Sequence, residues 1–109
     1  MRKSVLYVDG HYLTVDTKIL DIFTPGVFQG KGVFETLLAI GNQVFDVPAH
    51  LKRLKGGFKG KLKITAQVIQ EIVKRNGHAI SRVRVVAWRE NGKQHIALMA
   101  LKYTFPESK

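Results

Sequence analysis

Three pairs of turn-forming residues constrain the fold of this chain more than any other feature. Asp9-Gly10, Gly41-Asn42 and Asn91-Gly92 each separate two β-prone runs. Asp, Asn and Gly tolerate the left-handed backbone conformations that tight hairpin turns require. The runs around the three pairs span residues 4–8, 12–15, 33–40, 43–45, 83–88 and 95–101. The sequence therefore predicts about six strands, arranged as three antiparallel hairpins.

The third hairpin shows an alternation that assigns its faces. Val83, Val85 and Ala87 alternate along it with Arg82, Arg84 and Val86. Successive side chains of a strand point to opposite faces of its sheet. We therefore expect the first set to lie on the better-buried face.

A first helix is expected directly after the second hairpin. Pro48 suits the first turn of a helix, where its missing N–H would have no partner. Leu51, Leu54 and Phe58 follow at spacings of three and four residues and form one apolar stripe. We expect Gly56-Gly57 to end this helix.

A second helix is expected between Thr65, as its N-terminal cap, and Asn76-Gly77, as its stop. Its apolar stripe consists of Val68, Ile69, Ile72 and Val73. Strands at both ends of the chain and helices in the middle predict an α+β fold. Its architecture would be a mostly antiparallel sheet with two helices on one face.

Composition limits the classes of protein that remain. A chain of 109 residues is long enough for one domain, and no apolar run reaches the roughly 18 residues of a membrane span. The absence of cysteine excludes disulfides, a cysteine nucleophile and a thiolate zinc site. The histidines (His11, His50, His78 and His95) have no metal-binding spacing, so we expect no metal. We expect a cytoplasmic protein.

The charge leaves three interpretations open. Lys and Arg total 18 against 8 Asp and Glu, a formal net charge of +10. Within residues 52–63 lie six of these cations: Lys52, Arg53, Lys55, Lys59, Lys61 and Lys63. They could form a solvated basic face, bind a small phosphate-bearing ligand, or bind nucleic acid. Single-strand binders place aromatic residues among their cations, and here only Phe58 does so, which makes nucleic acid the least expected partner.

Two positions stand out for chemistry. Glu35 lies within an apolar run, where a charge needs a partner or solvent, and we expect it to point to solvent from its strand. His50 and Arg53 are three residues apart and so lie on one face of the first helix. An arginine there can present its guanidinium fork to a phosphate.

Three motifs together resemble one enzyme family. They are Gly-Lys-Gly-Val-Phe-Glu-Thr at 30–36, Gly-Asn-Gln-Val-Phe at 41–45 and His-Leu-Lys-Arg-Leu at 50–54. In order and spacing they are similar to the N-terminal small domain of class IV pyridoxal-phosphate enzymes. That family comprises branched-chain aminotransferases, D-amino-acid aminotransferases and aminodeoxychorismate lyases. The resemblance spans residues 4–103.

The resemblance implies roles for individual residues. Arg53 would bind the phosphate of pyridoxal 5′-phosphate. Phe34 and Gln29 would line the substrate pocket, and Arg84 or Arg89 would meet a substrate carboxylate. Thr24-Pro25 and Lys31 depart from the family pattern, which affects the substrate class more than the fold.

The resemblance also implies that a part of the enzyme lies elsewhere. In this family the lysine that forms the Schiff base belongs to a second, C-terminal domain, and no lysine here can be matched to it. Residues 1–103 would be the small domain and residues 104–109 the start of an interdomain linker. We therefore expect no catalytic residue in this chain, no activity without a C-terminal domain or companion chain, and a homodimer.

An aminotransferase is the first expectation and an aminodeoxychorismate lyase the second. A stand-alone basic module for nucleic acid or another polyanion remains as a different class of function.

Overall fold

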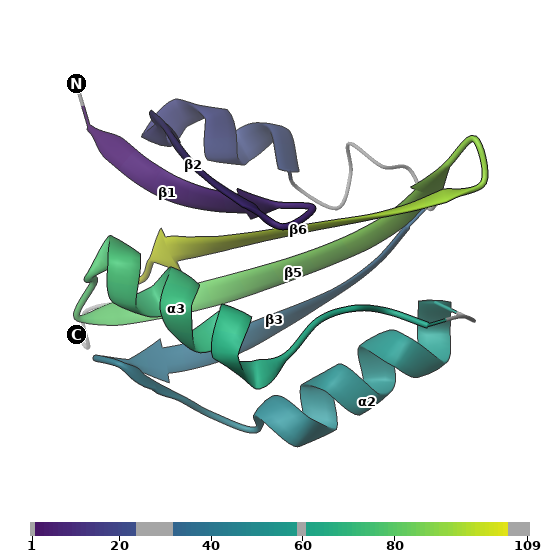
Figure 1. Ribbon diagram of the computed structural model, residues 1–109. Helices are drawn as coiled ribbons and strands as arrows, with labels where there is room; N and C mark the ends of the chain where they lie inside the picture. The colour runs from purple at the N-terminus through teal and green to yellow at the C-terminus, as the bar shows by residue number, and fades with distance from the viewer. Residues whose placement is uncertain (1, 24–31, 59–60, 105–109) are drawn as a thin grey trace.

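Six antiparallel strands form one sheet in the computed structural model, which describes residues 2–23, 32–58 and 61–104 (Figure 1). In chain order the elements are β1 (Lys3–Val8), β2 (His11–Asp16), the 3-10 helix η1 (Thr17–Phe23), β3 (Gly32–Ile40), β4 (Gln43–Val44), α2 (Val47–Phe58), α3 (Ala66–Asn76), β5 (Ile80–Glu90) and β6 (Lys93–Lys102). The predicted α+β fold, with three hairpins and two helices, is confirmed.

The strand order is β2-β1-β6-β5-β3-β4, so β6 lies in the middle of the sheet between β1 and β5. β5 pairs with the whole of β6, from Ser81 opposite Lys102 to Glu90 opposite Lys93. β1 meets β6 at only two register pairs, which involve Tyr7 and Val8. The N-terminal hairpin is therefore joined to the rest of the sheet by a short seam.

The two helices pack on one face of the sheet and bury most of the core (Figure 1). Val83, Val85 and Ala87 lie under them with no exposed surface, as their alternation predicts. Within α3, the predicted stripe is confirmed by Ile69, Ile72 and Val73, which are fully buried.

Both predicted signals at the ends of α3 are confirmed. The Thr65 side chain accepts a hydrogen bond from the N–H of Val68, which satisfies one of the unpaired donors of the first turn. Gly77 adopts the left-handed conformation, with φ of 66°, and donates its N–H to the carbonyl of Val73.

The end of α2 differs from the prediction. The helix continues through Gly56-Gly57 to Phe58, so the glycine pair does not end it. Phe58 is only 5% exposed and packs in the core under the helices. Burying a phenyl ring contributes about 2–3 kcal/mol, which exceeds the roughly 1 kcal/mol cost of each glycine. Arg89 also satisfies the end of the helix, because its Nη1 donates to the Phe58 carbonyl at 3.0 Å.

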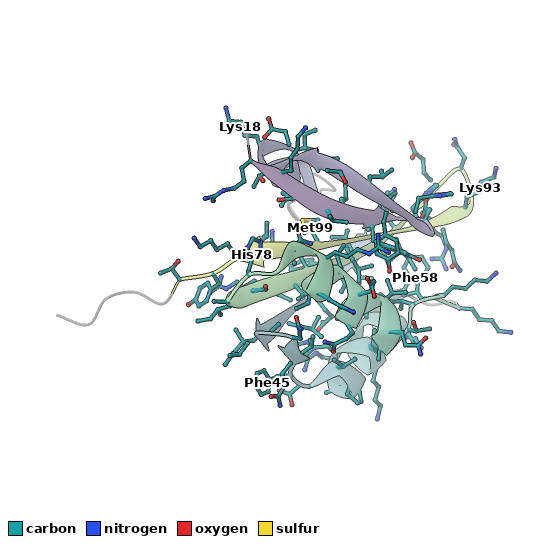
Figure 2. The ribbon with its side chains drawn as sticks, turned by 60° about the vertical axis from the view of Figure 1, so that its left-hand side comes forward. Lys18, Phe45, Phe58, His78, Lys93 and Met99 are labelled. Atoms are coloured by element: carbon teal, nitrogen blue, oxygen red, sulfur yellow. The ribbon has the colours of Figure 1, made fainter. Side chains whose placement is uncertain are left out.

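The second face of the sheet is covered in part by η1, which the sequence patterns do not predict (Figure 1). Leu20 of η1 packs with Leu6, Val86 and Met99 in a small separate core. Figure 2 shows Met99 close to the N-terminal hairpin. We call this second side of the sheet the outer face. Over β3 it carries three exposed apolar side chains: Phe34, Leu38 and Ile40.

The side chain of Asn76 ties α3 to β1. Its Oδ1 accepts from the N–H of Val5, and its Nδ2 donates to the carbonyl of Val5, both at 3.0 Å. Nδ2 also donates to the carbonyl of Ile72 at 2.8 Å. Val5 is paired with Thr14 of β2, and on its other edge the amide group of Asn76 takes the place of a partner from β6, because the register pairs of β1 with β6 involve only Tyr7 and Val8.

Candidate functional site

Three charged or titratable side chains meet where α2 packs against β3. Oε1 of Glu35 lies 2.6 Å from Nδ1 of His50. The same oxygen accepts from Arg53, with Nε at 3.2 Å and Nη2 at 2.9 Å. We call Glu35, His50 and Arg53 the β3–α2 cluster.

The side-chain periodicity of β3 and of α2 brings the three residues of this cluster together. Glu35 has the same parity on β3 as Leu37 and Ala39, which are buried under the helices, so its side chain points to α2. His50 and Arg53 are one helical turn apart and face it together, as their spacing predicts.

Arg53 lies beside an open stretch of strand. β4 pairs only with Ala39 and Ile40, so among the described residues no strand covers the edge of β3 beside Glu35. The Arg53 side chain is 62% exposed at this edge, although its partner Glu35 is only 18% exposed. The guanidinium group is thus fixed by a mostly enclosed carboxylate and remains accessible from solvent.

The prediction that Glu35 points to solvent is wrong. Its exposed fraction is 18%, and it has two partners on α2. An antiparallel strand offers two faces, and the residue pattern around Glu35 is apolar on both, so periodicity alone could not assign its side. The opposing charges on the helix, His50 and Arg53, were the signal that could have done so.

Competing effects act on the Glu35 carboxyl group. Burial raises its pKa, but hydrogen bonds from Arg53 and His50 and the positive charge of Arg53 outweigh burial, so the pKa is lowered below its ordinary value. The pKa of Arg53 is raised, chiefly by its hydrogen bond to Glu35. Glu35 and Arg53 are therefore an ion pair at neutral pH.

The short contact between Glu35 and His50 fixes the imidazole tautomer. Two acceptor atoms cannot approach to 2.6 Å without a proton between them. Because the carboxyl group is ionised, Nδ1 of His50 carries the proton and donates it to Oε1. Nδ1 then cannot accept from Nη2 of Arg53, so their 2.9 Å separation reflects a shared partner, Glu35.

Arg53 retains a donor for a further ligand. Its Nε and Nη2 are engaged by Glu35, whereas Nη1 has no protein partner among the described residues. A guanidinium nitrogen with free N–H groups at an exposed edge suits an anion with several acceptor oxygens, such as a phosphate. The carboxylate of Glu35 holds the fork in one orientation, which lowers the entropy lost when an anion binds.

The other predicted site residues divide between the two faces of the sheet. Phe34, 47% exposed, and Arg84 both lie on the outer face, where Arg84 is directly opposite Thr36 in the register. Nε of Arg84 is buried, and no atom of the described residues accepts a hydrogen bond from it. A buried donor of this kind favours an acceptor that completes it.

Arg89 lies on the helix side, apart from Arg84. Its guanidinium group covers the ring of Phe58 at 4.0 Å and donates to the carbonyl of the same residue. The structure therefore does not bring Arg84 and Arg89 together. Gln29 lies outside the described residues.

Two further observations bear on the type of site. Among the described residues, no group of three or more His, Asp or Glu side chains could hold a metal ion. Within the same ranges, no helix is both long enough and apolar enough to cross a membrane.

Solved structures of branched-chain aminotransferases contain the same fold. An enzyme from the archaeon Thermoproteus uzoniensis, solved with norvaline, matches with a TM-score of 0.67 and 21% identity, over 94% of this chain. A putative branched-chain amino acid aminotransferase from Thermotoga maritima matches with a TM-score of 0.63 and 15% identity, also over 94%. A third branched-chain amino acid aminotransferase, solved with pyridoxamine 5′-phosphate, matches with a TM-score of 0.72 and 17% identity, over 100% of this chain.

These matches cover only part of the enzymes. The chain spans 42% of the length of the Thermoproteus uzoniensis chain, 39% of the Thermotoga maritima chain and 43% of the chain solved with pyridoxamine 5′-phosphate. No protein-family model and no curated protein sequence matches this chain. At these identities the similarity defines the fold: an α+β unit that, in branched-chain aminotransferases, is accompanied by a larger part of the chain.

Proposed function

We propose that this chain is the N-terminal small domain of a class IV pyridoxal-phosphate-dependent aminotransferase, with Arg53 as its phosphate ligand. The β3–α2 cluster is the observation that carries this proposal. It presents a fixed guanidinium group at an exposed strand edge, and Nη1 of this group has no partner in the described ranges. The fold match to branched-chain aminotransferases supports it.

The residues of the cluster fit a phosphate group. Arg53 would donate from Nη1, while Glu35 and His50 act as positioning residues that hold the guanidinium in place. Glu35 also repels a phosphate, so its value lies in orientation and not in added charge. In the complete enzyme, pyridoxal phosphate supplies the aldehyde and the electron-withdrawing ring that amino-group transfer requires.

The outer face would contribute to the substrate pocket. Phe34 offers an exposed aromatic surface there, and the buried Nε of Arg84 has no partner within the described part of the chain. We assign the substrate carboxylate to Arg84, because Arg89 already serves the end of α2. The family resemblance assigns Gln29 to the same pocket, although this residue lies outside the described residues.

A second domain is part of the proposal. The Schiff-base lysine and most contacts to the cofactor ring would come from a C-terminal domain or a companion chain, with residues 104–109 leading into it. The share of 42% or 43% of the aminotransferase chains supports this division. The complete enzyme would act on amino acids, and this chain alone would be inactive.

A binding experiment tests the role of Arg53. Pyridoxamine 5′-phosphate is a suitable probe, because it carries the phosphate but cannot form a Schiff base with lysine. Titration would be followed by amide NMR signals of β3 and α2. We expect Arg53→Gln to weaken binding about tenfold or more, because a charge-assisted contact is lost.

The matched control is Lys55→Gln, which removes one positive charge from the same helix at an exposed position. It should change affinity less than about twofold if the guanidinium contact matters and the overall charge does not. Pyridoxamine without phosphate should bind neither variant. Equal losses in Arg53→Gln and Lys55→Gln would contradict a phosphate site at Arg53.

A separate experiment tests whether the Schiff-base lysine lies outside this chain. The chain would be mixed with pyridoxal phosphate, reduced with borohydride and weighed by mass spectrometry. We expect no stoichiometric adduct at a unique lysine. Such an adduct would show that a lysine of this chain is the reactive one, and it would overturn the assignment of that group to another domain.

A further inference from the structure

An asparagine or aspartate precedes a glycine at three places in the chain: Asp9-Gly10, Asn76-Gly77 and Asn91-Gly92. In an Asn-Gly pair the backbone nitrogen of glycine can attack Cγ of the asparagine, because glycine has no Cβ to obstruct the approach. The new N–Cγ bond closes a succinimide ring, and the side-chain amide leaves as ammonia with the proton of the attacking N–H. Water then opens the ring to aspartate or isoaspartate. An Asp-Gly pair closes the same ring with loss of water.

Asn76-Gly77 is held at both reacting groups. The side-chain amide of Asn76 forms three hydrogen bonds, to the N–H and the carbonyl of Val5 at 3.0 Å and to the carbonyl of Ile72 at 2.8 Å. The N–H of Gly77 donates to the carbonyl of Val73 at 3.0 Å. Ile72 and Val73 are fully buried, so we expect these bonds to open only when the end of α3 unfolds.

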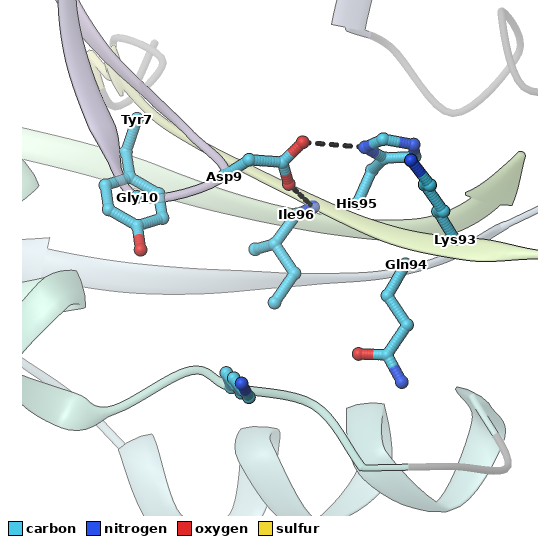
Figure 3. Close-up of a pocket in the computed structure, with 8 residues that line it drawn as sticks. Tyr7, Asp9, Gly10, Lys93, Gln94, His95 and Ile96 are labelled. Carbon is cyan, nitrogen blue, oxygen red and sulfur yellow. Dashed lines mark hydrogen bonds and ion pairs between the residues drawn. The ribbon is translucent and has the colours of Figure 1, made fainter.

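The carboxylate of Asp9-Gly10 is held by β6. Oδ1 of Asp9 accepts from the N–H of Ile96 at 2.7 Å, and Oδ2 lies 2.6 Å from Nδ1 of His95. Figure 3 shows both contacts as dashed lines. The N–H of Asp9 also donates to the carbonyl of Ile96 at 3.0 Å. The reacting carboxyl group is therefore fixed, and a carboxylate is in addition a weaker electrophile than an amide.

At Asn91-Gly92 neither reacting group is held. Both residues are exposed in the turn between β5 and β6 (Figure 1). Within the described ranges, no atom forms a hydrogen bond with the Asn91 side chain, and the N–H of Gly92 has no acceptor. The flanking residues Glu90, Lys93 and Gln94 are exposed as well. This end of the hairpin can therefore open without exposing the core.

The turn has to open before Asn91 reacts. Asn91 and Gly92 have φ of 52° and 78°, the left-handed conformations of a two-residue hairpin turn. Ring closure needs a different backbone torsion at the asparagine, which brings the glycine nitrogen towards Cγ. An exposed turn reaches such conformations at a small cost in free energy, whereas the end of a packed helix does so only by unfolding. Local opening therefore sets the rate, which should differ widely between Asn91 and Asn76.

We infer that Asn91 is a modification site of the folded chain, at which attack by the Gly92 nitrogen and then hydrolysis convert asparagine to aspartate or isoaspartate. Asn76 stays unmodified until the end of α3 unfolds. Water is the only co-reactant, and the reaction involves neither Arg53 nor the phosphate site proposed above.

The modification changes both the charge and the geometry of the turn. Its product carries a carboxylate, so the formal net charge of +10 falls by one. Isoaspartate also lengthens the main chain by one carbon atom. A two-residue turn has a fixed length, so we expect isoaspartate to disrupt the pairing of Glu90 with Lys93.

The test follows each asparagine by mass spectrometry while the folded chain is incubated at mildly alkaline pH. Samples are digested at acidic pH, which limits deamidation during digestion, and each peptide reports the replacement of NH2 by OH. We expect Asn91 to react at least about tenfold faster than Asn76. In the chain unfolded by denaturant, the two Asn-Gly pairs should react at rates within about twofold of each other, because the native contacts that separate them are lost.

Two controls separate opening of the turn from unfolding of the chain. Denaturant below the unfolding transition should leave the rate at Asn91 nearly unchanged and raise the rate at Asn76, whose bonds open only with loss of buried structure. Asn91→Gln should abolish the acidic species that ion exchange detects after incubation, because glutamine has to close a larger ring. The matched variant Asn42→Gln, in another exposed turn, should still form it. Equal rates at Asn76 and Asn91 in the folded chain, or an Asn91 rate that rises with denaturant as the Asn76 rate does, would overturn the inference.

Discussion

A single carboxylate determines the arrangement of the candidate site. Glu35 is mostly enclosed, yet it stays ionised because Arg53 and His50 donate to it. It also fixes the imidazole tautomer of His50. The two donors come from α2, so the carboxylate couples a strand and a helix through one oxygen atom.

Replacing Glu35 with Gln should change how stability depends on pH. The pKa of Glu35 in the folded chain lies below its ordinary value of 4.5, so the ionised group stabilises the fold above that pH. This stabilisation is lost as the pH falls through the folded pKa. Chemical denaturation across the acid range should therefore show a steeper loss of stability in the parent than in Glu35→Gln.

Glu71→Gln serves as the control for this change. Glu71 pairs with Arg75 one turn away on α3 and is 39% exposed, so solvent screens the pair. The unfolding free energy of Glu71→Gln should therefore fall with decreasing pH as steeply as that of the unsubstituted chain. If the unfolding free energy of Glu35→Gln also fell as steeply as that of the unsubstituted chain, the lowered pKa of Glu35 would be contradicted.

Asn76 is a second residue with an effect beyond its own helix. Asn76→Ala would leave the N–H and carbonyl of Val5 without their partner, which costs about 1–3 kcal/mol of unfolding free energy. Denaturant unfolding measures the change. Gln67→Ala, at an exposed position of the same helix, should change stability by less than about 0.5 kcal/mol. If Asn76→Ala and Gln67→Ala lowered the unfolding free energy equally, the hydrogen bonds between Asn76 and Val5 would not contribute to stability.

At the scale of elements, short sequence signals predicted most of the strands, turns and helix ends that the structure contains. The hairpin turns were predictable because their backbone demands are local, and Asp9, Gly41 and Asn91 do adopt positive φ. The caps of α3 were predictable for the same reason. The end of α2 was not, because the burial of Phe58 and the hydrogen bond from Arg89 come from distant parts of the chain.

The candidate site was predictable to a similar extent. Arg53 and His50 share a helix face because of their spacing alone. The side of β3 on which Glu35 lies depends on which face α2 covers, and no local pattern specifies that.

Gly56 within α2 and Gly77 at the C-terminal cap of α3 should respond in opposite ways to replacement by alanine. A Cβ at Gly56 would meet nothing within 4 Å, so Gly56→Ala should stabilise the chain by roughly 0.5–1 kcal/mol. Gly77 has a φ of +66°, so Gly77→Ala should destabilise it by roughly 1–2 kcal/mol. Unfolding free energies of the two variants test this. A loss in Gly56→Ala would indicate that α2 ends at the glycine pair in solution.

At the scale of the whole molecule, the sheet has one well-covered face and one partly covered face. α2 and α3 bury the first face, whereas η1 covers only part of the outer face. Phe34, Leu38 and Ile40 remain 47%, 36% and 49% exposed there. Exposed apolar surface of this kind favours association with another protein surface.

The isolated chain should therefore self-associate with rising concentration. The double variant L38T/I40T keeps residues that suit strands but removes much of this apolar surface. We expect its sedimentation coefficient to depend less on concentration than that of the parent, with little change in unfolding free energy. The variant T14S, remote on β2, is the control. A parent that stays monomeric throughout would contradict the prediction.

The central place of β6 has a consequence for synthesis of the chain. β6 follows the other five strands in the sequence, yet it lies between β1 and β5. As the polypeptide emerges from the ribosome, the first hairpin has no strand to join until β6 has been made. Until then the two halves of the sheet exist only as separate pieces. The time between translation of β1 and of β6 is thus the period in which the nascent chain most needs protection from aggregation.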